Sequence, residues 1–159
     1  MNRIKTKEKL NHHFILIEAP CELVASEIIS WGEALWWPKK SFMMFTRLTP
    51  GEIKLGTKYR QKVLLPLGPA WEAEITRLIP GKEIERTFLN GIFQGKETIS
   101  LEQRYNGIKV DYLMRYQVVG ILNKILWQLI FQKMHDRNIE TILKALQEYM
   151  TNQQKKDTP

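Results

Sequence analysis

The segment Ile121–Met150 constrains the fold most, because its pattern requires one long helix. It contains neither proline nor glycine, and its apolar residues recur at helical spacing. A helix of about 30 residues is roughly 45 Å long. The fold therefore has to accommodate one helix much longer than the other elements.

The stretch before this helix, residues 41–119, predicts an antiparallel meander. Short runs rich in β-branched and aromatic residues alternate there with the turn signals TPGE, PLGP, PGK and NG. The NG pair, Asn106–Gly107, is the strongest hairpin signal, since both residues tolerate the positive φ of a type I′ turn. Upstream, His12–Ala19 predicts a first strand, and residues 21–37 predict two short helices separated at Gly32.

Length and composition indicate one globular domain. The chain has 159 residues, of which 43% are hydrophobic and 26% charged. We expect a basic tail over residues 1–11, a single domain over 12–150 and a polar tail over 151–159. The single cysteine, Cys21, excludes an internal disulfide framework. No secretory signal and no bilayer-spanning apolar run is found, so the cytoplasm is the default compartment, with peripheral attachment at a membrane surface as an option.

Pairing across the predicted hairpins divides the sheet into a polar and an apolar face. If Tyr105 pairs with Ile108, alternate residues of neighbouring strands share one side. The predicted inward face contains Ile84, Phe88, Ile99, Leu101, Val110, Tyr112, Met114 and Tyr116, and parity adds Tyr59, Gln61, Val63, Trp71, Ala73 and Ile75.

Polar residues interrupt this apolar face. Arg86, Glu97, Gln61 and Gln103 fall on it together with the tyrosines. One interpretation is a buried ion pair between Arg86 and Glu97, or a wrong register. The other is an internal cavity with polar groups in its wall, since polar groups are buried only with hydrogen-bond partners.

One stripe of the long helix has apolar ends and a polar middle. At 100° per residue the stripe contains Ile121, Ile125, Gln128, Gln132, His135, Ile139, Leu143 and Leu146. Such a helix would close a partly polar cavity; alternatively, it kinks or rotates so that the polar residues face solvent. The first part, ILNKILWQLIF, is apolar nearly all round and needs further cover. Strand connections, a second subunit docked on Leu126–Phe131 in a homodimer, or a peripheral membrane contact could supply it.

The order of these segments resembles the SRPBCC superfamily, which includes START domains, the birch-pollen-allergen fold and the polyketide cyclase/dehydrase family. The resemblance covers about residues 12–150 and rests on HHFILIEAP, SWGEALWWP, GTKYRQKV and AWEAEITRLIPGKEIE. It implies an α+β helix-grip fold, in which a curved antiparallel sheet wraps a long C-terminal helix and two short helices follow the first strand. Relatives bind lipids, sterols, polyketides or quinones in the enclosed cavity.

The residues and the resemblance together predict that the chain binds a hydrophobic or amphiphilic small molecule, such as a lipid, quinone or polyketide-like compound, as a carrier or sensor. The alternative is a cyclase or dehydratase in which Arg86, Glu97, a cavity tyrosine and His135 act on such a molecule. No catalytic residue is assigned. The candidate ligand-binding residues are Trp37, Tyr59, Gln61, Trp71, Arg86, Phe88, Glu97, Ile99, Tyr112, Met114, Tyr116, Gln128, Gln132 and His135.

Other classes of partner receive little support. The chain has none of the common nucleophile, nucleotide or metalloprotease motifs, and no cofactor is expected. His12 and His13 are consecutive in a predicted strand and therefore point to opposite faces, which disfavours a shared metal ion. The net charge is +7, but the basic residues are scattered, which disfavours nucleic-acid binding.

Overall fold

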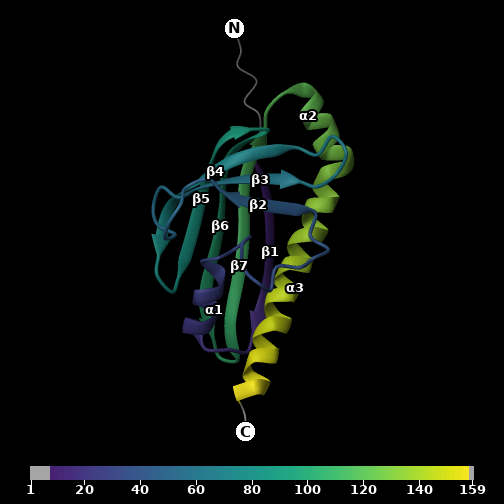
Figure 1. Cartoon of the computed structure of the whole chain (residues 1–159). Coiled ribbons are helices and arrows are strands. Elements are labelled where there is room, and N and C mark those ends of the chain that lie inside the picture. Colours follow the sequence, from purple (N-terminus) through teal and green to yellow (C-terminus); the bar gives the residue numbers. More distant parts are fainter. Residues whose placement is uncertain (1–7, 158–159) are drawn as a thin grey trace.

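In a computed structural model, which describes residues 8–157, a curved antiparallel sheet wraps around one long helix (Figure 1). The described residues form a seven-stranded sheet in the order β1-β7-β6-β5-β4-β3-β2. The meander runs from β2 to β7, and β1 pairs with β7 at the edge. The strands are β1 (Lys9–Ile17), β2 (Met43–Arg47), β3 (Lys58–Val63), β4 (Ala70–Ile79), β5 (Glu83–Gly91), β6 (Phe93–Arg104) and β7 (Gly107–Val118).

The long helix is confirmed and has three consecutive parts. These are α2 (Ile121–Leu126), the π-helical turn η1 (Trp127–Phe131) and α3 (Gln132–Asp157). It continues past Met150 into the predicted polar tail, and β1 begins within the predicted basic tail, of which residues 1–7 lie outside the described residues. None of the helices in residues 8–157 is long and apolar enough to cross a bilayer.

Of the two short helices predicted after the first strand, the first is confirmed and the second is wrong. The confirmed helix is α1 (Cys21–Ile28), which lies against β6 and β7. Residues 29–37 form turns instead of a second helix. Gly32 has φ +93°, outside the helical region, and a Cβ there would lie 2.3 Å from the Phe45 ring. The aromatic side chains of this segment pack into the core from the turns.

The predicted faces of the sheet are confirmed although the predicted register is wrong by two residues. Arg104 pairs with Gly107, so the turn is Tyr105–Asn106, and Tyr105 does not pair with Ile108 as predicted. Gly107 is already the first residue of β7, and its φ of +140° is one that residues other than glycine rarely adopt. Because the side-chain period of a strand is two, this even shift leaves each side chain on its predicted face.

A glycine inside β6 allows the backbones of β6 and β7 to approach closely. Gly95 has φ +130°, and a Cβ at this position would lie 2.0 Å from the carbonyl oxygen of Arg115 on β7. Only glycine permits such a close approach of the two backbones. The two strands therefore stay paired at Gly95, which lies opposite Tyr116.

Candidate functional site

Most of the predicted site residues lie together in the interior, between the concave face of the sheet and the long helix. Gln132 on α3 and Trp37 after α1 are half-buried, and Gln128 is exposed. The others are buried: Tyr59, Gln61, Trp71, Arg86, Phe88, Glu97, Ile99, Tyr112, Met114, Tyr116 and His135. The interior site is therefore built mainly from β3–β7, and His135 is the predicted residue of α3 that is buried in it.

The exposure of Gln128 follows from the π-helical turn. A π-helix accommodates one extra residue, so the helix before it is rotated relative to the helix after it. Trp127 and Phe131 therefore face the interior, and Trp127 Nε1 donates a hydrogen bond to the Tyr116 hydroxyl (2.9 Å). The expected inward position of Gln128 is wrong for this reason. Ile121 and Ile125, from the same predicted stripe, are also exposed.

The polar contacts of the interior converge on Glu97. Gln61 Nε2 and Arg86 Nη1 donate to Glu97 Oε1 at 2.8 and 3.3 Å, and the Tyr112 hydroxyl donates to Oε2 at 3.0 Å. The expected alternative of a buried Arg86–Glu97 ion pair is thus present, and both side chains are almost completely buried. The carboxylate has more partners than the ion pair alone supplies.

Arg86 is held by groups from three other segments. Its Nη2 donates to the Trp31 carbonyl (3.3 Å), and its guanidinium carbon lies 5.0 Å from the Tyr59 ring centroid and 5.8 Å from that of Phe45. Together with Glu97, these contacts fix the position of the cation. Burial raises the pKa of Tyr59, and the nearby Arg86 charge opposes this effect. Trp31 and Phe45 were not predicted, because neither lies in a segment whose pairing could be worked out from the sequence.

His135 connects this network to the long helix. Since the Tyr112 hydroxyl donates to Glu97, its oxygen accepts from His135 Nε2–H at 3.4 Å. Burial, with a smaller contribution from His13, lowers the pKa of His135 to about 3, so the ring is neutral near pH 7. Burial and the Glu97 charge raise the pKa of Tyr112 well above its ordinary value. Neither group gains or loses a proton near neutral pH.

Several buried polar atoms in the interior have no hydrogen-bond partner among the described residues. Two belong to one face of α3: His135 Nδ1, which is an acceptor in this tautomer, and Asn138 Nδ2, which is a donor. The other end of the Asn138 side chain is engaged, because Oδ1 accepts from the Phe42 N–H at 2.9 Å. Gln61 Oε1 and Trp71 Nε1 likewise have no hydrogen-bond partner within residues 8–157. Unpaired buried groups are rare and costly.

A small cavity lies beside His135 and Asn138, at the seam between the β2–β3 edge and the long helix. Its volume is about 10 Å³, room for roughly one water molecule. The wall is otherwise apolar and consists of Phe42, Met43, Val63, Trp127, Phe131 and Met134. The large cavity expected from the resemblance is instead filled by aromatic side chains, among them Trp31, Trp71, Phe93 and Trp127.

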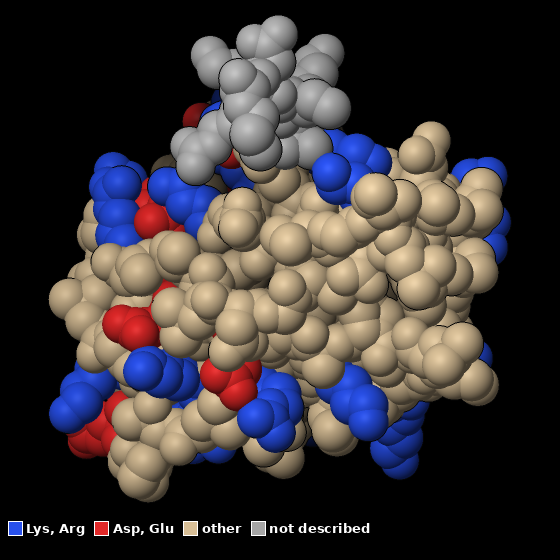
Figure 2. All heavy atoms as spheres, turned by 90° about the horizontal axis from the view of Figure 1, so that it is seen from above, with Lys and Arg blue, Asp and Glu red and all other residues tan. Residues whose placement is uncertain are grey.

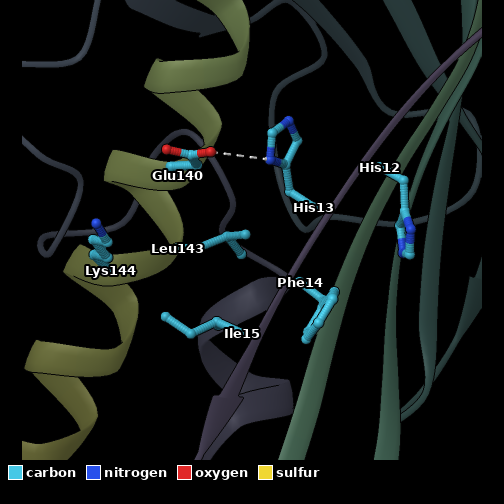
Figure 3. A pocket seen from close by; sticks show the side chains of 7 residues that line it. All are labelled: His12, His13, Phe14, Ile15, Glu140, Leu143 and Lys144. Atoms are coloured by element: carbon cyan, nitrogen blue, oxygen red, sulfur yellow. Dashed lines mark ion pairs between the residues drawn. The ribbon is translucent and has the colours of Figure 1, made fainter.

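A larger hollow lies outside this site, between β1 and α3 (Figure 3). It measures about 330 Å³ and is open to solvent. His13 points toward Glu140, with 3.8 Å between Nδ1 and Oε1, whereas His12 points away on the other side of β1 and contacts Asp111 at 2.8 Å (Figure 3). The predicted divergence of the two histidines is therefore confirmed.

Comparison with known proteins shows the fold. No family model and no curated protein matches the sequence. Among solved structures, norcoclaurine synthase of Thalictrum flavum, in complex with a transition-state analogue, has a TM-score of 0.71 at 13% identity, over 96% of this chain and 99% of that one. The protein TTHA0849 of Thermus thermophilus has a TM-score of 0.68 at 18% identity, over 92% of this chain and 98% of that one. Ara h 8.0201 has a TM-score of 0.65 at 15% identity, over 92% of this chain and 99% of that one. These proteins share a helix-grip architecture with this chain.

Proposed function

Because the chain has the helix-grip fold of the SRPBCC superfamily, as its sequence predicted, we propose that it binds an amphiphilic small molecule at the seam beside His135 and Asn138, as a carrier or sensor. The observation that carries the proposal is the pair of unpartnered polar atoms, His135 Nδ1 and Asn138 Nδ2, in an otherwise apolar cavity wall. An acceptor and a donor on one helix face suit a group that both donates and accepts, such as a hydroxyl.

The chemistry of the wall narrows the ligand further. The Arg86 and Glu97 charges are already paired with each other. His135 is neutral near pH 7, because burial lowers its pKa to about 3. An uncharged head group therefore fits better than an ionised one, since a buried charge needs a counter-charge. The apolar part of the ligand would lie against Phe42, Phe131 and Met134.

Binding requires the cavity to widen, and the contacts of the long helix support opening at this seam. On the β1 side, Gln147 Nε2 donates to the Leu16 carbonyl (2.7 Å), and Asp136 contacts Asn11 and His13. On the β2–β3 side, the closure consists of apolar side chains and the hydrogen bond from Phe42 to Asn138. Separation on that side would expose His135 and Asn138 while α3 stays anchored along β1.

Binding is favoured over catalysis by the proton affinities of the buried groups. General acid–base catalysis works best when the pKa of the catalytic group lies near the working pH. The pKa of His135 is about 3 and that of Tyr112 is raised, so both groups are better suited to hold a hydrogen bond than to transfer a proton.

The experiment compares 1-decanol with decyl methyl ether, which cannot donate a hydrogen bond, by titration followed through tryptophan fluorescence. We expect the alcohol to bind about fivefold more tightly, as one additional hydrogen bond implies. His135→Phe should abolish this preference while the ether still binds. Absence of saturable binding, or an unchanged preference in the variant, would contradict the proposal.

A further inference from the structure

The outer side of α2 and η1 presents large apolar residues to solvent. Ile121, Leu122 and Leu129 are 79%, 68% and 72% exposed, and Ile125 and Ile130 are about half exposed. This exposure is a consequence of the π-helical turn, which directs Trp127 and Phe131 inward and their neighbours outward. Contiguous apolar exposure of this kind marks an interaction surface rather than an ordinary solvated helix.

Two neighbouring segments extend this apolar surface. The connection that leads into β2 contributes Phe42, and the β3–β4 connection contributes Leu64 and Leu67, all exposed. These segments lie together, since Leu64 N–H donates to the Phe42 carbonyl at 2.7 Å. They also border the helix, because Phe42 and Val63 share the wall of the small cavity with Phe131. We call the exposed apolar residues of α2, η1 and these two segments the mouth surface.

The charges of the mouth surface have one sign. The segments 38–44, 62–70 and 119–134 contain Lys39, Lys40, Lys62, Lys124 and Lys133, and no aspartate or glutamate. Viewed from the end at which α2 lies, a broad uncharged surface has charged side chains, many of them basic, toward its edges (Figure 2). An apolar area with a lysine rim matches the interface of a bilayer that carries anionic lipids.

We infer that the mouth surface docks on anionic membranes. A second copy of this chain is the poorer occupant, because it would bring the same lysines, and a second net charge of +7, against the first. A bilayer satisfies both features, since acyl chains receive the leucine and isoleucine side chains and lipid phosphates lie near the lysines. If the proposed function holds, docking also places the seam beside His135 against the lipid, from which an amphiphile would enter.

The test is flotation of the purified protein with vesicles of phosphatidylcholine alone, and of phosphatidylcholine mixed with phosphatidylglycerol. We expect binding to the mixed vesicles that weakens as salt is added, because salt screens the lysine–phosphate attraction. Leu129→Ser should weaken binding about tenfold, and Lys124→Gln about fivefold. The matched controls are Leu55→Ser and Lys82→Gln, at exposed positions outside the mouth surface; Leu55 is 60% exposed. Neither control should change binding.

Three outcomes would overturn the inference. They are no binding to the mixed vesicles, equal losses from Leu129→Ser and Leu55→Ser, or a concentration-dependent dimer that Leu129→Ser disrupts. The result is separable from ligand binding, because His135→Phe alters the cavity wall and leaves the mouth surface intact. Retained flotation of that variant with lost preference for 1-decanol supports both proposals. Flotation of the unmodified protein without any binding of 1-decanol would leave the docking inference standing alone.

Discussion

Glu97 is the residue on which the buried polar network depends most. It accepts hydrogen bonds from Gln61, Arg86 and Tyr112, which come from three other strands of the sheet. Removing one member of a buried ion pair leaves the other charged and unpaired, which costs more than losing the attraction itself. Replacing one residue of the network should therefore destabilise the fold more than replacing an exposed residue.

Glu97→Gln should lower the free energy of unfolding by about 3–5 kcal/mol, because Arg86 stays buried without its counter-charge. The double variant Arg86→Met/Glu97→Leu should be less destabilised than the single one. Equilibrium unfolding in urea measures both. Arg60→Gln is the control, since it breaks the exposed Arg60–Glu72 pair (2.8 Å) and should barely move the midpoint. A Glu97→Gln midpoint equal to that of the control would contradict the account.

His135 should make stability depend on acidity. Its pKa is about 3 when folded, whereas an unfolded histidine has a pKa of about 6.5. Between these values the unfolded chain binds the additional proton, so the His135 contribution to stability is complete above about pH 6.5 and is lost as the pH falls toward 3. From pH 7 to 5 the loss is about 2 kcal/mol. Urea unfolding at a series of pH values measures this contribution, which should vanish in His135→Gln. If the free energy of unfolding falls equally with pH in the two proteins, the prediction is contradicted.

At the scale of elements, the sequence predicts the sheet far better than the helix face. Strand alternation places Tyr59, Arg86 and Tyr112 correctly even though the predicted hairpin register is two residues off, because an even slip preserves the face. In a helix, by contrast, a shift of one or two residues moves a side chain to a different face. One extra residue in η1 rotates everything before it, so Gln128 is exposed while His135 is buried as expected. Nothing in the local sequence distinguishes that π-turn from an α-turn.

Deleting Gln128 should test whether η1 contains one residue more than a continuous α-helix. After the deletion Trp127 lies seven residues before His135, which is the spacing that puts two residues on one face of an α-helix. Trp127, which is 1% exposed, should therefore keep its contacts with Phe93 and Tyr116, and the free energy of unfolding should change by less than about 1 kcal/mol. Gln128→Ala, which keeps the residue count, should also behave like the unmodified protein. A loss of about 3–5 kcal/mol on deletion, with a red shift of tryptophan emission, would contradict the claim that the extra residue sets this rotation.

At the scale of the whole molecule, the two long sides of the helix differ. Polar contacts along β1 anchor α3, whereas an apolar seam borders β2 and β3. Of the residues at the seam, the sequence predicts Val63 and His135 as inward-facing, and both are buried. It could not reveal the seam itself, because the closure depends on how far the aromatic side chains fill the interior. It also left three options for covering Leu126–Phe131; Trp127 and Phe131 are covered by their own chain, and the docking inference concerns their exposed neighbours.

The most direct measurement is methyl NMR of the methionines during titration with 1-decanol. Met43 and Met134 line the cavity at the seam, Met150 is buried outside its wall, and Met44 is exposed. The account predicts saturable shifts of the Met43 and Met134 signals, intermolecular contacts from both methyl groups to the decyl chain, and an unchanged Met150 signal. Shifts confined to Met44, or no saturable shift at Met43 and Met134, would contradict the claim that the seam is a ligand-binding site.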